Sequence, residues 1–356
     1  MNKTQKINVA ILFGGKSVEH EVSLQSAKNV INAIDKEKYN IILIGIDKKG
    51  KWLLNSENPK LVRLNKSGDN VALIPQSGGK LINLSNPAKK QAIDVVFPIL
   101  HGSFGEDGTI QGLLKLANIP FVGADVLGSA VCMDKDIMKR LLKEAHIPIA
   151  NFLVLKDENN IKFEEVVKNI GLPFFVKPAN LGSSVGISKV KNKKEFSKAM
   201  ATAFRYDRKI LLEEYIHGRE IECSVIGNNN PIVSIPGEII VNDEFYSYES
   251  KYIDENGAIL KIPAKLKENA IKKIQNLAIK TFKILSCEGL GRVDFFLRDN
   301  GEIIVNEINT MPGFTSASMY PRLWEASGIS YKDLIDRLIK LAIERFEKEQ
   351  KIKISY

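Results

Sequence analysis

Short apolar runs alternate with longer amphipathic segments in the first third of the chain. Three apolar runs predict strands and two amphipathic segments predict helices: Val9–Phe13, Ile41–Ile46 and Val95–Ile99 for the strands, Leu24–Ile34 and Thr109–Ala117 for the helices. We expect Ser23 to be the N-cap of the first helix. Such alternation is typical of a doubly wound parallel sheet with crossover helices. Residues 47–91 are polar and rich in turns, and they predict no element.

The rest of the chain divides into two further units. The first combines predicted helices at Lys135–Ala145 and Lys194–Ala203 with strands at Phe174–Lys177, Gly186–Val190 and Ile210–Ile216. The second has antiparallel strands, a helix from about Lys265 to Leu285, a hairpin and a terminal helix rich in Lys and Glu. We therefore expect an α/β fold, α+β in its C-terminal half, with domains at residues 1–125, 126–217 and 218–356.

The hairpin in the last unit is the strongest local signal. Its strands, Val293–Leu297 and Ile303–Ile308, flank the turn sequence Asp299-Asn300-Gly301. Because side chains alternate along a strand, residues two apart at the inner strand ends share one face of the sheet.

Four polar side chains on this hairpin form a candidate site. Arg292 and Asp294 share one face, as do Glu307 and Asn309, and Gly313 follows the second strand. Two carboxylates and an amide oxygen beside a cation suit a hard metal such as Mg²⁺, with substrate phosphates completing its shell. The alternative is a buried salt bridge, but four such residues together favour a site.

Composition argues against several classes of protein. The chain of 356 residues carries a net charge of +9, but its Lys residues are spread along the sequence without a basic block, which argues against a nucleic-acid partner. Three cysteines without Cys-x-x-Cys spacing indicate neither a disulfide framework nor a zinc site. The polar segment Met1–Lys6 is unlike a signal peptide, and no apolar run approaches the ~20 residues of a membrane span. We therefore expect a cytoplasmic protein.

A glycine-rich loop follows the strand that ends at Lys177. The loop, Ala179–Gly186, includes Ser183 and Ser184, and such loops offer N–H and O–H donors to phosphate oxygens. A snorkelling lysine and an ordinary turn are the alternatives, yet with Lys135 as a second cation the set favours phosphate binding. It is not a P-loop, because Ala10 stands where the first glycine before Gly15-Lys16-Ser17 is required.

Other polar segments at strand ends carry weaker signals. The strand end with Glu213, Tyr215, Ile216 and the following Glu220 could bind adenine and ribose, although this signal alone does not distinguish a binding site from an ordinary strand end. Glu19 opens a helix, where a carboxylate usually complements the helix dipole but could also bind a ligand.

Two more segments have open interpretations. His101-Gly102 and the residues up to Gly108 follow a strand, where open α/β sheets bind ligands. Residues 246–252 are either surface aromatics or a mobile lid.

At these residues the chain resembles the ATP-grasp superfamily, and within it the D-alanine–D-alanine ligases, over nearly its whole length. Six ordered motifs carry the resemblance: Gly14-Gly15-x-Ser17-x-Glu19-His20-x-Val22-Ser23; His101-Gly102-x-x-Gly105-Glu106-Asp107-Gly108 with Gln111-Gly112; Met133-Asp134-Lys135; Lys177-Pro178 with Gly182-Ser183-Ser184-x-Gly186; Lys251-Tyr252; and Arg292-x-Asp294 with Asn306-Glu307-x-Asn309-Thr310-x-Pro312-Gly313. The resemblance implies an ATP-grasp fold, a parallel-sheet domain followed by two ATP-grasp subdomains.

The resemblance also implies how ATP is bound. Lys135 and Lys177 would hold the α- and β-phosphates, and Ser183, Ser184 and Lys251 complete the phosphate side. Glu213, Tyr215, Ile216 and Glu220 would hold the adenosine. Two Mg²⁺ ions, or Mn²⁺, would bind Asp294, Glu307 and Asn309 and bridge the phosphates.

The implied chemistry joins two D-alanines for peptidoglycan precursor synthesis, in a cytoplasmic homodimer. ATP phosphorylates the first carboxylate, the second amine attacks the acyl phosphate, and phosphate leaves. Six residues would bind or activate the substrates. Glu19 would hold the first ammonium, His101 the first carboxylate, Arg292 and the Gly313 N–H the oxyanion, and Ser318 with the Met319 backbone the second carboxylate.

One tyrosine bears on acceptor specificity, and another departs from the pattern of the relatives. Ser183 and Tyr252 would link to Glu19 across a closed lid, and retention of Tyr252 favours an amine acceptor because relatives that make D-alanyl-D-lactate replace it. Tyr215 stands where several relatives carry tryptophan. The alternatives are a ligase of this fold with D-lactate or D-serine as acceptor, and a non-catalytic nucleotide-binding regulator.

Overall fold

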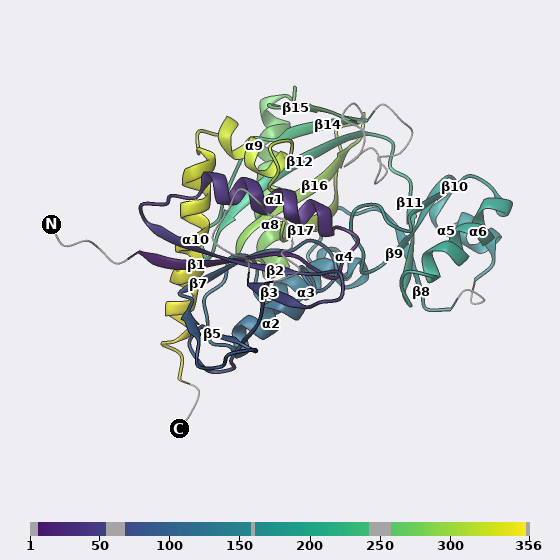
Figure 1. Cartoon of the computed structure of the whole chain (residues 1–356). Coiled ribbons are helices and arrows are strands. Elements are labelled where there is room, and N and C mark those ends of the chain that lie inside the picture. Colours follow the sequence, from purple (N-terminus) through teal and green to yellow (C-terminus); the bar gives the residue numbers. More distant parts are fainter. Residues whose placement is uncertain (1–5, 55–67, 158–160, 242–257, 354–356) are drawn as a thin grey trace.

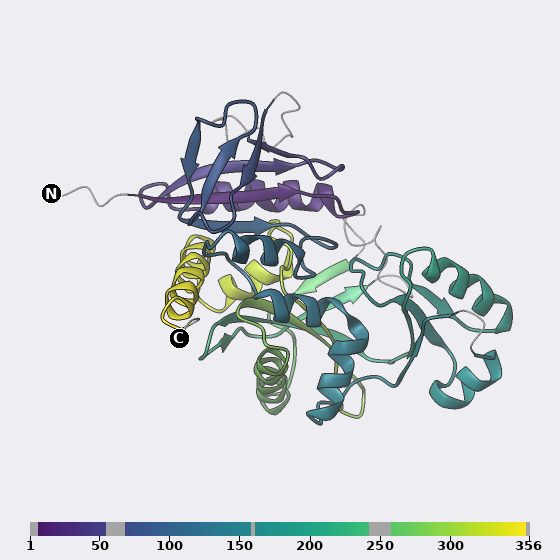
Figure 2. The ribbon, with the colours of Figure 1, turned by 90° about the horizontal axis from the view of Figure 1, so that it is seen from below.

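Three β-sheets organise the residues that the structure describes. The computed structural model describes residues 6–54, 68–157, 161–241 and 258–353. Figure 2 shows the N-terminal sheet above the C-terminal unit, with the central unit extending to the right. Across the described residues, no helix combines the length and apolar character that crossing a bilayer requires.

The N-terminal sheet is parallel across its three predicted strands, which lie together at one side of the sheet. Its order is β6-β5-β4-β3-β2-β1-β7, and β1 (Ile7–Gly14) pairs in parallel with β2 (Tyr39–Ile46) and β7 (Val95–Ile99). Residues 47–91, for which no element was predicted, contribute four antiparallel strands to one edge: β3 (Trp52–Leu54), β4 (Asp69–Leu73), β5 (Lys80–Asn83) and β6 (Lys90–Ala92).

Both faces of this sheet are covered, which explains its continuous apolar strands. Val9, Ile11 and Phe13 of β1 pack into the core formed with α1 (His20–Ala33) and the terminal helix α10 (Tyr331–Glu349), visible in Figure 1. Ala10 and Leu12 face the opposite core, under α2 (Thr109–Leu116). The last helix of the chain therefore stabilises its first sheet.

Ser23 is not the N-cap of the first helix, and that prediction is wrong. The helix begins at His20, one turn earlier. The Ser23 hydroxyl is buried, accepts from the Gly14 N–H at 2.8 Å, and donates to the Ile99 carbonyl. It satisfies backbone groups at the ends of two strands, which a sequence pattern cannot anticipate.

The central unit is a four-stranded sheet covered by helices on one face. The strand order is β10-β9-β11-β8, with bounds β8 (Phe152–Leu155), β9 (Phe174–Pro178), β10 (Ser188–Val190) and β11 (Ile210–Glu214). Phe174 and Val176 pack under α5 (Phe163–Ile170) and α6 (Lys193–Phe204). By alternation, Lys177 and Glu213 lie on the other face of the sheet.

The C-terminal sheet has the order β15-β14-β12-β16-β17, with β13 beside β12. Its strands are β12 (Arg219–Gly227), β13 (Ile232–Val233), β14 (Gly237–Val241), β15 (Ala258–Lys261), β16 (Gly289–Leu297) and β17 (Ile303–Asn309). Val293, Phe295 and Ile308 pack on one face against α8 (Glu268–Ile284). Polar residues at alternate positions occupy the opposite face.

The helices α3 (Val126–Met133) and α4 (Lys135–Glu144) lead from the N-terminal sheet to the central one, and α9 (Met319–Ala326) lies between β17 and α10. Asp134 caps α4, with its side chain accepting from Asp136 N and Ile137 N. Cys132 and Cys287 are free thiols whose Sγ atoms lie 3.2 Å apart, although 155 positions separate them in sequence.

Candidate active site

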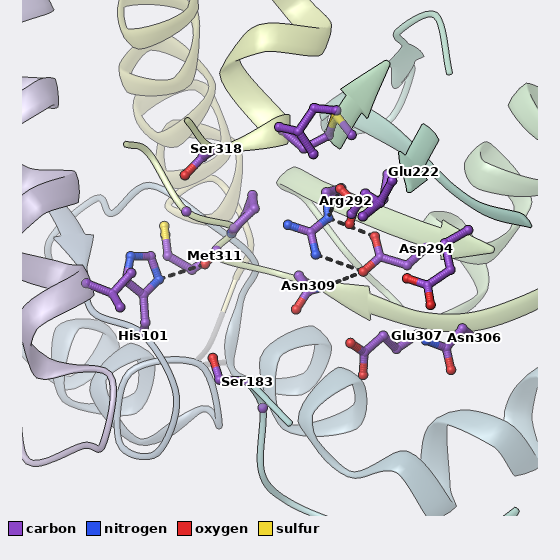
Figure 3. A pocket seen from close by; sticks show the side chains of 18 of the residues that line it. His101, Ser183, Glu222, Arg292, Asp294, Asn306, Glu307, Asn309, Met311 and Ser318 are labelled. Carbon is purple, nitrogen blue, oxygen red and sulfur yellow. Dashed lines mark hydrogen bonds and ion pairs between the residues drawn. The ribbon is translucent and has the colours of Figure 1, made fainter. Parts of the chain in front are cut away.

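The predicted hairpin is the centre of the site. In the pairing of β16 with β17, Arg292 lies opposite Asn309 and Asp294 lies opposite Glu307. A register shift follows immediately after Asp294. All four side chains therefore belong to one face at one end of the hairpin, as the alternation predicted (Figure 3).

The charges on this face form a connected network. Arg292 donates from Nε to Asp294 Oδ1 and from Nη2 to Asp294 Oδ2, both at 2.8 Å. Asn309 Nδ2 donates to Asp294 Oδ2 at 2.9 Å. Burial opposes the charge on Arg292, but Asp294 and Glu222 outweigh it and raise the pKa of the guanidinium. Arg292 is a fixed cation.

Glu222 is a site residue that the sequence did not single out. Its Oε2 atom lies 2.8 Å from Arg292 Nε, and it is buried on β12 directly opposite Asp294. Only the order of strands in the sheet brings these residues together. Glu220 and Glu222 are two residues apart on one strand, so they lie on the same face of the sheet. This alternation could have predicted Glu222 as a site residue once Glu220 was chosen.

Two adjoining cavities collect most of the predicted residues. The first is lined by Glu19, His101, Arg292, Asp294, Glu307, Asn309, Gly313, Ser318 and Met319, among others. The second is lined by Lys135, Lys177, Ser183, Ser184, Glu213, Tyr215, Ile216, Glu220 and Glu307, among others. Ser183, Glu220 and Glu307 line both, so the cavities meet there. Lys251, Tyr252 and the proposed lid at 246–252 lie outside the described residues.

The second cavity has two lysines beside the glycine-rich loop Ala179–Gly186. Lys135 Nζ donates to the Leu181 carbonyl at 2.8 Å and lies 3.3 Å from Glu307 Oε2. Ser183 and Ser184 have φ of 52° and 60°, a left-handed backbone that turns the loop sharply. Lys177 Nζ lies 2.5 Å from Glu213 Oε1. The loop and both lysines thus come together as predicted.

Glu19 is held in the first cavity by the loops around it. Ser183 donates a hydrogen bond to Glu19 Oε1, joining the glycine-rich loop to the start of α1. At Gly102, with φ +72°, an added Cβ would lie 2.4 Å from Glu19 Oε2. Both the backbone conformation and the close approach therefore require glycine at this position.

His101 contacts the protein through both ring nitrogens. Nδ1 lies 3.0 Å from the Met311 carbonyl, and Nε2 lies 3.0 Å from Ser26 Oγ. Ser26 Oγ also accepts from the Phe314 N–H at 3.2 Å. His101 and Ser26 thus fix the loop that carries Gly313, and Ser26 was not anticipated because its partners lie far along the chain.

Glu106 is a buried carboxyl beside His101 with an unusually high pKa. Its Oε1 lies 3.5 Å from His101 Nδ1. Burial, reinforced by nearby Glu19 and opposed by His101, raises the pKa of Glu106 to about 7. Burial alone would lower the pKa of His101, but Glu106 outweighs it and raises that pKa.

Gly313 and Ser318 lie on one tight loop. Ser318 Oγ accepts from the Thr315 N–H at 3.0 Å and lies 2.7 Å from Thr315 Oγ1. A Cβ on Gly313 would come within 2.6 Å of Ser318 Oγ. Ser318 occupies the N-cap position of α9 without a side-chain cap bond. The first N–H groups of α9 are therefore suited to a carboxylate.

The donor set fits a divalent cation that also binds phosphate. Among the described residues, no three His, Cys, Asp or Glu side chains form a metal cluster. Asp294 and Glu307 instead supply two carboxylates, with the Asn309 amide two residues away. A hard ion held by these oxygens keeps coordination positions for substrate phosphates.

Comparisons with known proteins agree with this geometry. The family model described as D-ala D-ala ligase N-terminus matches residues 8–124, and the model described as D-ala D-ala ligase C-terminus matches residues 141–340. The D-alanine–D-alanine ligase of Oceanobacillus iheyensis is 55% identical over 361 aligned residues, which cover 98% of this chain and 99% of the relative.

Solved structures share the fold over nearly the whole length. The D-alanine–D-alanine ligase from Coxiella burnetii has a TM-score of 0.87 and 39% identity, covering 98% of this chain and 97% of that one. The VanG D-Ala:D-Ser ligase from Enterococcus faecalis also has a TM-score of 0.87, with 38% identity and coverage of 95% and 100%. These matches confirm the ATP-grasp fold expected from sequence. With both family models matched and a full-length relative at 55% identity, the chain belongs to the D-alanine–D-alanine ligase family.

Proposed function

We propose that this protein joins two D-alanine molecules at the expense of ATP, releasing ADP and phosphate, for peptidoglycan precursor synthesis. The observation that carries the proposal is the meeting of the two cavities at Glu307 and Ser183. One cavity has lysines and a phosphate loop, and the other has groups suited to amino-acid ends. A phosphoryl group passing between them would cross only that boundary.

ATP would lie in the cavity between the central and C-terminal sheets. Lys135 and Lys177, with the Ser183–Ser184 loop, would hold its phosphates, while Glu213, Tyr215, Ile216 and Glu220 would hold the adenosine. The cations reduce the repulsion between the triphosphate and an incoming carboxylate. Two Mg²⁺ ions held by Asp294, Glu307 and Asn309 would supply further charge neutralisation between the phosphates.

The first D-alanine would bind with its ammonium at Glu19. That carboxylate is held by Ser183, so its orientation depends on the phosphate loop. The substrate carboxylate would then take the γ-phosphoryl group and become an acyl phosphate. Arg292 and the Gly313 N–H would stabilise the oxyanion that forms when the second amine attacks this acyl phosphate.

The second D-alanine would place its carboxylate at Ser318 and the N-terminus of α9. The amine attacks the acyl carbon, the C–N bond forms, and the C–O bond to phosphate breaks. The likeness to a D-Ala:D-Ser ligase makes D-serine the acceptor to test beside D-alanine and D-lactate. The fixed Arg292 network and the intact carboxylates argue against a non-catalytic regulator.

A substrate panel tests the proposal. The enzyme is incubated with ATP, Mg²⁺ and D-alanine alone or paired with D-serine or D-lactate, and products are identified by mass spectrometry. We expect D-alanyl-D-alanine as the main product with one phosphate per dipeptide. Preference for D-lactate near neutral pH, or ATP turnover without any dipeptide, would refute it.

We also propose a cytoplasmic homodimer built from domains at residues 1–125, 126–217 and 218–356. Sedimentation equilibrium tests the dimer, and limited proteolysis with fragment mapping tests whether the first cuts fall near the two boundaries.

A further inference from the structure

A third lysine, Lys139, lies behind the nucleotide cavity that Lys135 and Lys177 line. Lys139 is on α4, one turn after Lys135, and its side chain is only 1% exposed. Its Nζ lies 2.7 Å from Glu213 Oε2 and 5.8 Å from the centre of the Phe152 ring, the cross-strand neighbour of Glu213. Burying an ammonium group costs free energy, and only a close carboxylate such as Glu213 can offset that cost.

Glu213 is shared between two cations. Lys139 approaches Oε2, and Lys177 approaches Oε1 at 2.5 Å from the cavity side. Burial opposes the charge on Glu213, but Lys139 and Lys177 outweigh it and hold the pKa of the carboxyl below its usual range. Glu213 is therefore a buried anion with one lysine on each oxygen.

Only one of the two lysines can reach ATP. Lys177 and Glu213 line the nucleotide cavity, whereas Lys139 is not among the described residues that line it. Burial lowers the pKa of Lys139, and the Glu213 carboxylate opposes that shift. With both lysines protonated, two ammonium groups on one carboxylate leave one positive charge in the cluster. If Lys139 were absent, Glu213 and Lys177 would cancel each other, and the cavity would lose a cation where the phosphates are expected.

We propose that Lys139 is a positioning residue for ATP: it neutralises Glu213 from behind, so that the charge of Lys177 acts on the phosphates. This inference rests on the proposed function, since it takes the second cavity as the ATP site.

Four variants test the role. Lys139→Met keeps the bulk of the side chain and removes its charge. Glu213→Gln removes the negative charge that Lys139 is proposed to neutralise. The double variant Lys139→Met/Glu213→Gln removes both. The matched control is Lys143→Met, one turn further along α4 at an exposed position. KM for ATP, KM for D-alanine, kcat and the melting temperature are measured for each.

The expected pattern separates charge balance from packing. Lys139→Met raises KM for ATP about tenfold to a hundredfold, with KM for D-alanine within twofold of wild type. The double variant returns KM for ATP to within about threefold of Glu213→Gln alone, because Lys177 again has no carboxylate to neutralise it. Lys143→Met matches wild type. If Lys139→Met does not fold, the double variant still tests the proposal. A double variant that folds and binds ATP like Glu213→Gln supports the same charge balance.

Two results would overturn the inference. One is a KM for ATP within twofold of wild type in Lys139→Met. The other is a rise that the double variant retains in full, which would indicate packing alone. Lys177→Met distinguishes this from failure of the proposed function: if that variant binds ATP as tightly as wild type, the ATP site itself is wrongly assigned and the inference falls with it.

Discussion

Glu307 Oε2 lies 3.3 Å from Lys135 Nζ, so a carboxylate of the C-terminal hairpin contacts a lysine at the start of α4. The two residues come from positions far apart in sequence and meet where the two cavities join. The contact places an expected metal ligand beside an expected phosphate ligand, which is the arrangement that phosphoryl transfer needs.

Glu307→Ala is expected to lower kcat by about a hundredfold or more, because the bound metal loses a carboxylate and Lys135 loses its partner. Steady-state phosphate release measures the effect. Glu302→Ala, an exposed position on the same hairpin, is the control and should keep wild-type turnover. Activity within a few-fold of wild type in Glu307→Ala would show that the metal assignment is wrong.

Gly102→Ala is expected to weaken binding of the first D-alanine while leaving KM for ATP nearly unchanged. Its Cβ would displace Glu19, and its positive φ adds strain of about 1–3 kcal/mol to the folded state. Gly112→Ala is the matched control, since nothing lies within 4 Å of an added Cβ there. Equal KM values for D-alanine in the two variants would refute the role of Gly102.

Glu222→Gln is expected to lower kcat about tenfold and the free energy of unfolding by about 1–3 kcal/mol. Arg292 keeps Asp294 but loses the second carboxylate that holds it in place. Kinetics and urea denaturation measure the two effects. The comparison is Glu268→Gln, which breaks an exposed pair with Lys272 and should cost less than about 0.5 kcal/mol. A Glu222→Gln enzyme as active as Glu268→Gln would contradict this account.

The pair of Glu106 and His101 should make stability fall as pH rises. Glu106 has a folded pKa of about 7 against an ordinary value of 4.5, so the folded state binds more protons between these values. The raised pKa of His101 acts in the same direction above its ordinary value of 6.5. Glu106→Gln removes the titration of the Glu106 carboxyl and reduces the rise in the pKa of His101, since Glu106 causes that rise.

Urea denaturation between pH 5 and pH 8 measures this dependence. Between pH 5 and pH 8 the free energy of unfolding of wild type should fall by up to about 3 kcal/mol more than that of Glu106→Gln. Parallel curves for the two proteins would mean that Glu106 is ionised in the folded state at pH 5.

Sequence was most informative where the site is local. The hairpin, its turn and its four polar residues lie within 22 positions, Arg292 to Gly313, so alternation along two strands predicted their shared face. The Lys177 strand and the loop after it were predicted for the same reason. The motifs shared with a known family then supplied roles that spacing alone does not give.

What sequence missed depends on contacts between distant elements. Glu222 joins the site through the pairing of β12 with β16, and Ser26 through contacts of α1 with His101 and the loop at Phe314. In the sequence Lys139 is not distinguishable from other helical lysines, and only the packing of α4 against β11 places it beside Glu213. The strands β3 to β6 have only three to five residues each, so each is too short to show a clear alternation of apolar and polar positions.

The most direct test of the account follows oxygen from substrate to product. D-alanine labelled with ¹⁸O in its carboxylate is incubated with ATP, Mg²⁺ and the enzyme, and the released phosphate is analysed by mass spectrometry. Formation and breakdown of an acyl phosphate transfers one labelled oxygen to each phosphate as D-alanyl-D-alanine forms. Dipeptide formation with unlabelled phosphate would contradict the acyl phosphate, and phosphate release without dipeptide would contradict ligation itself.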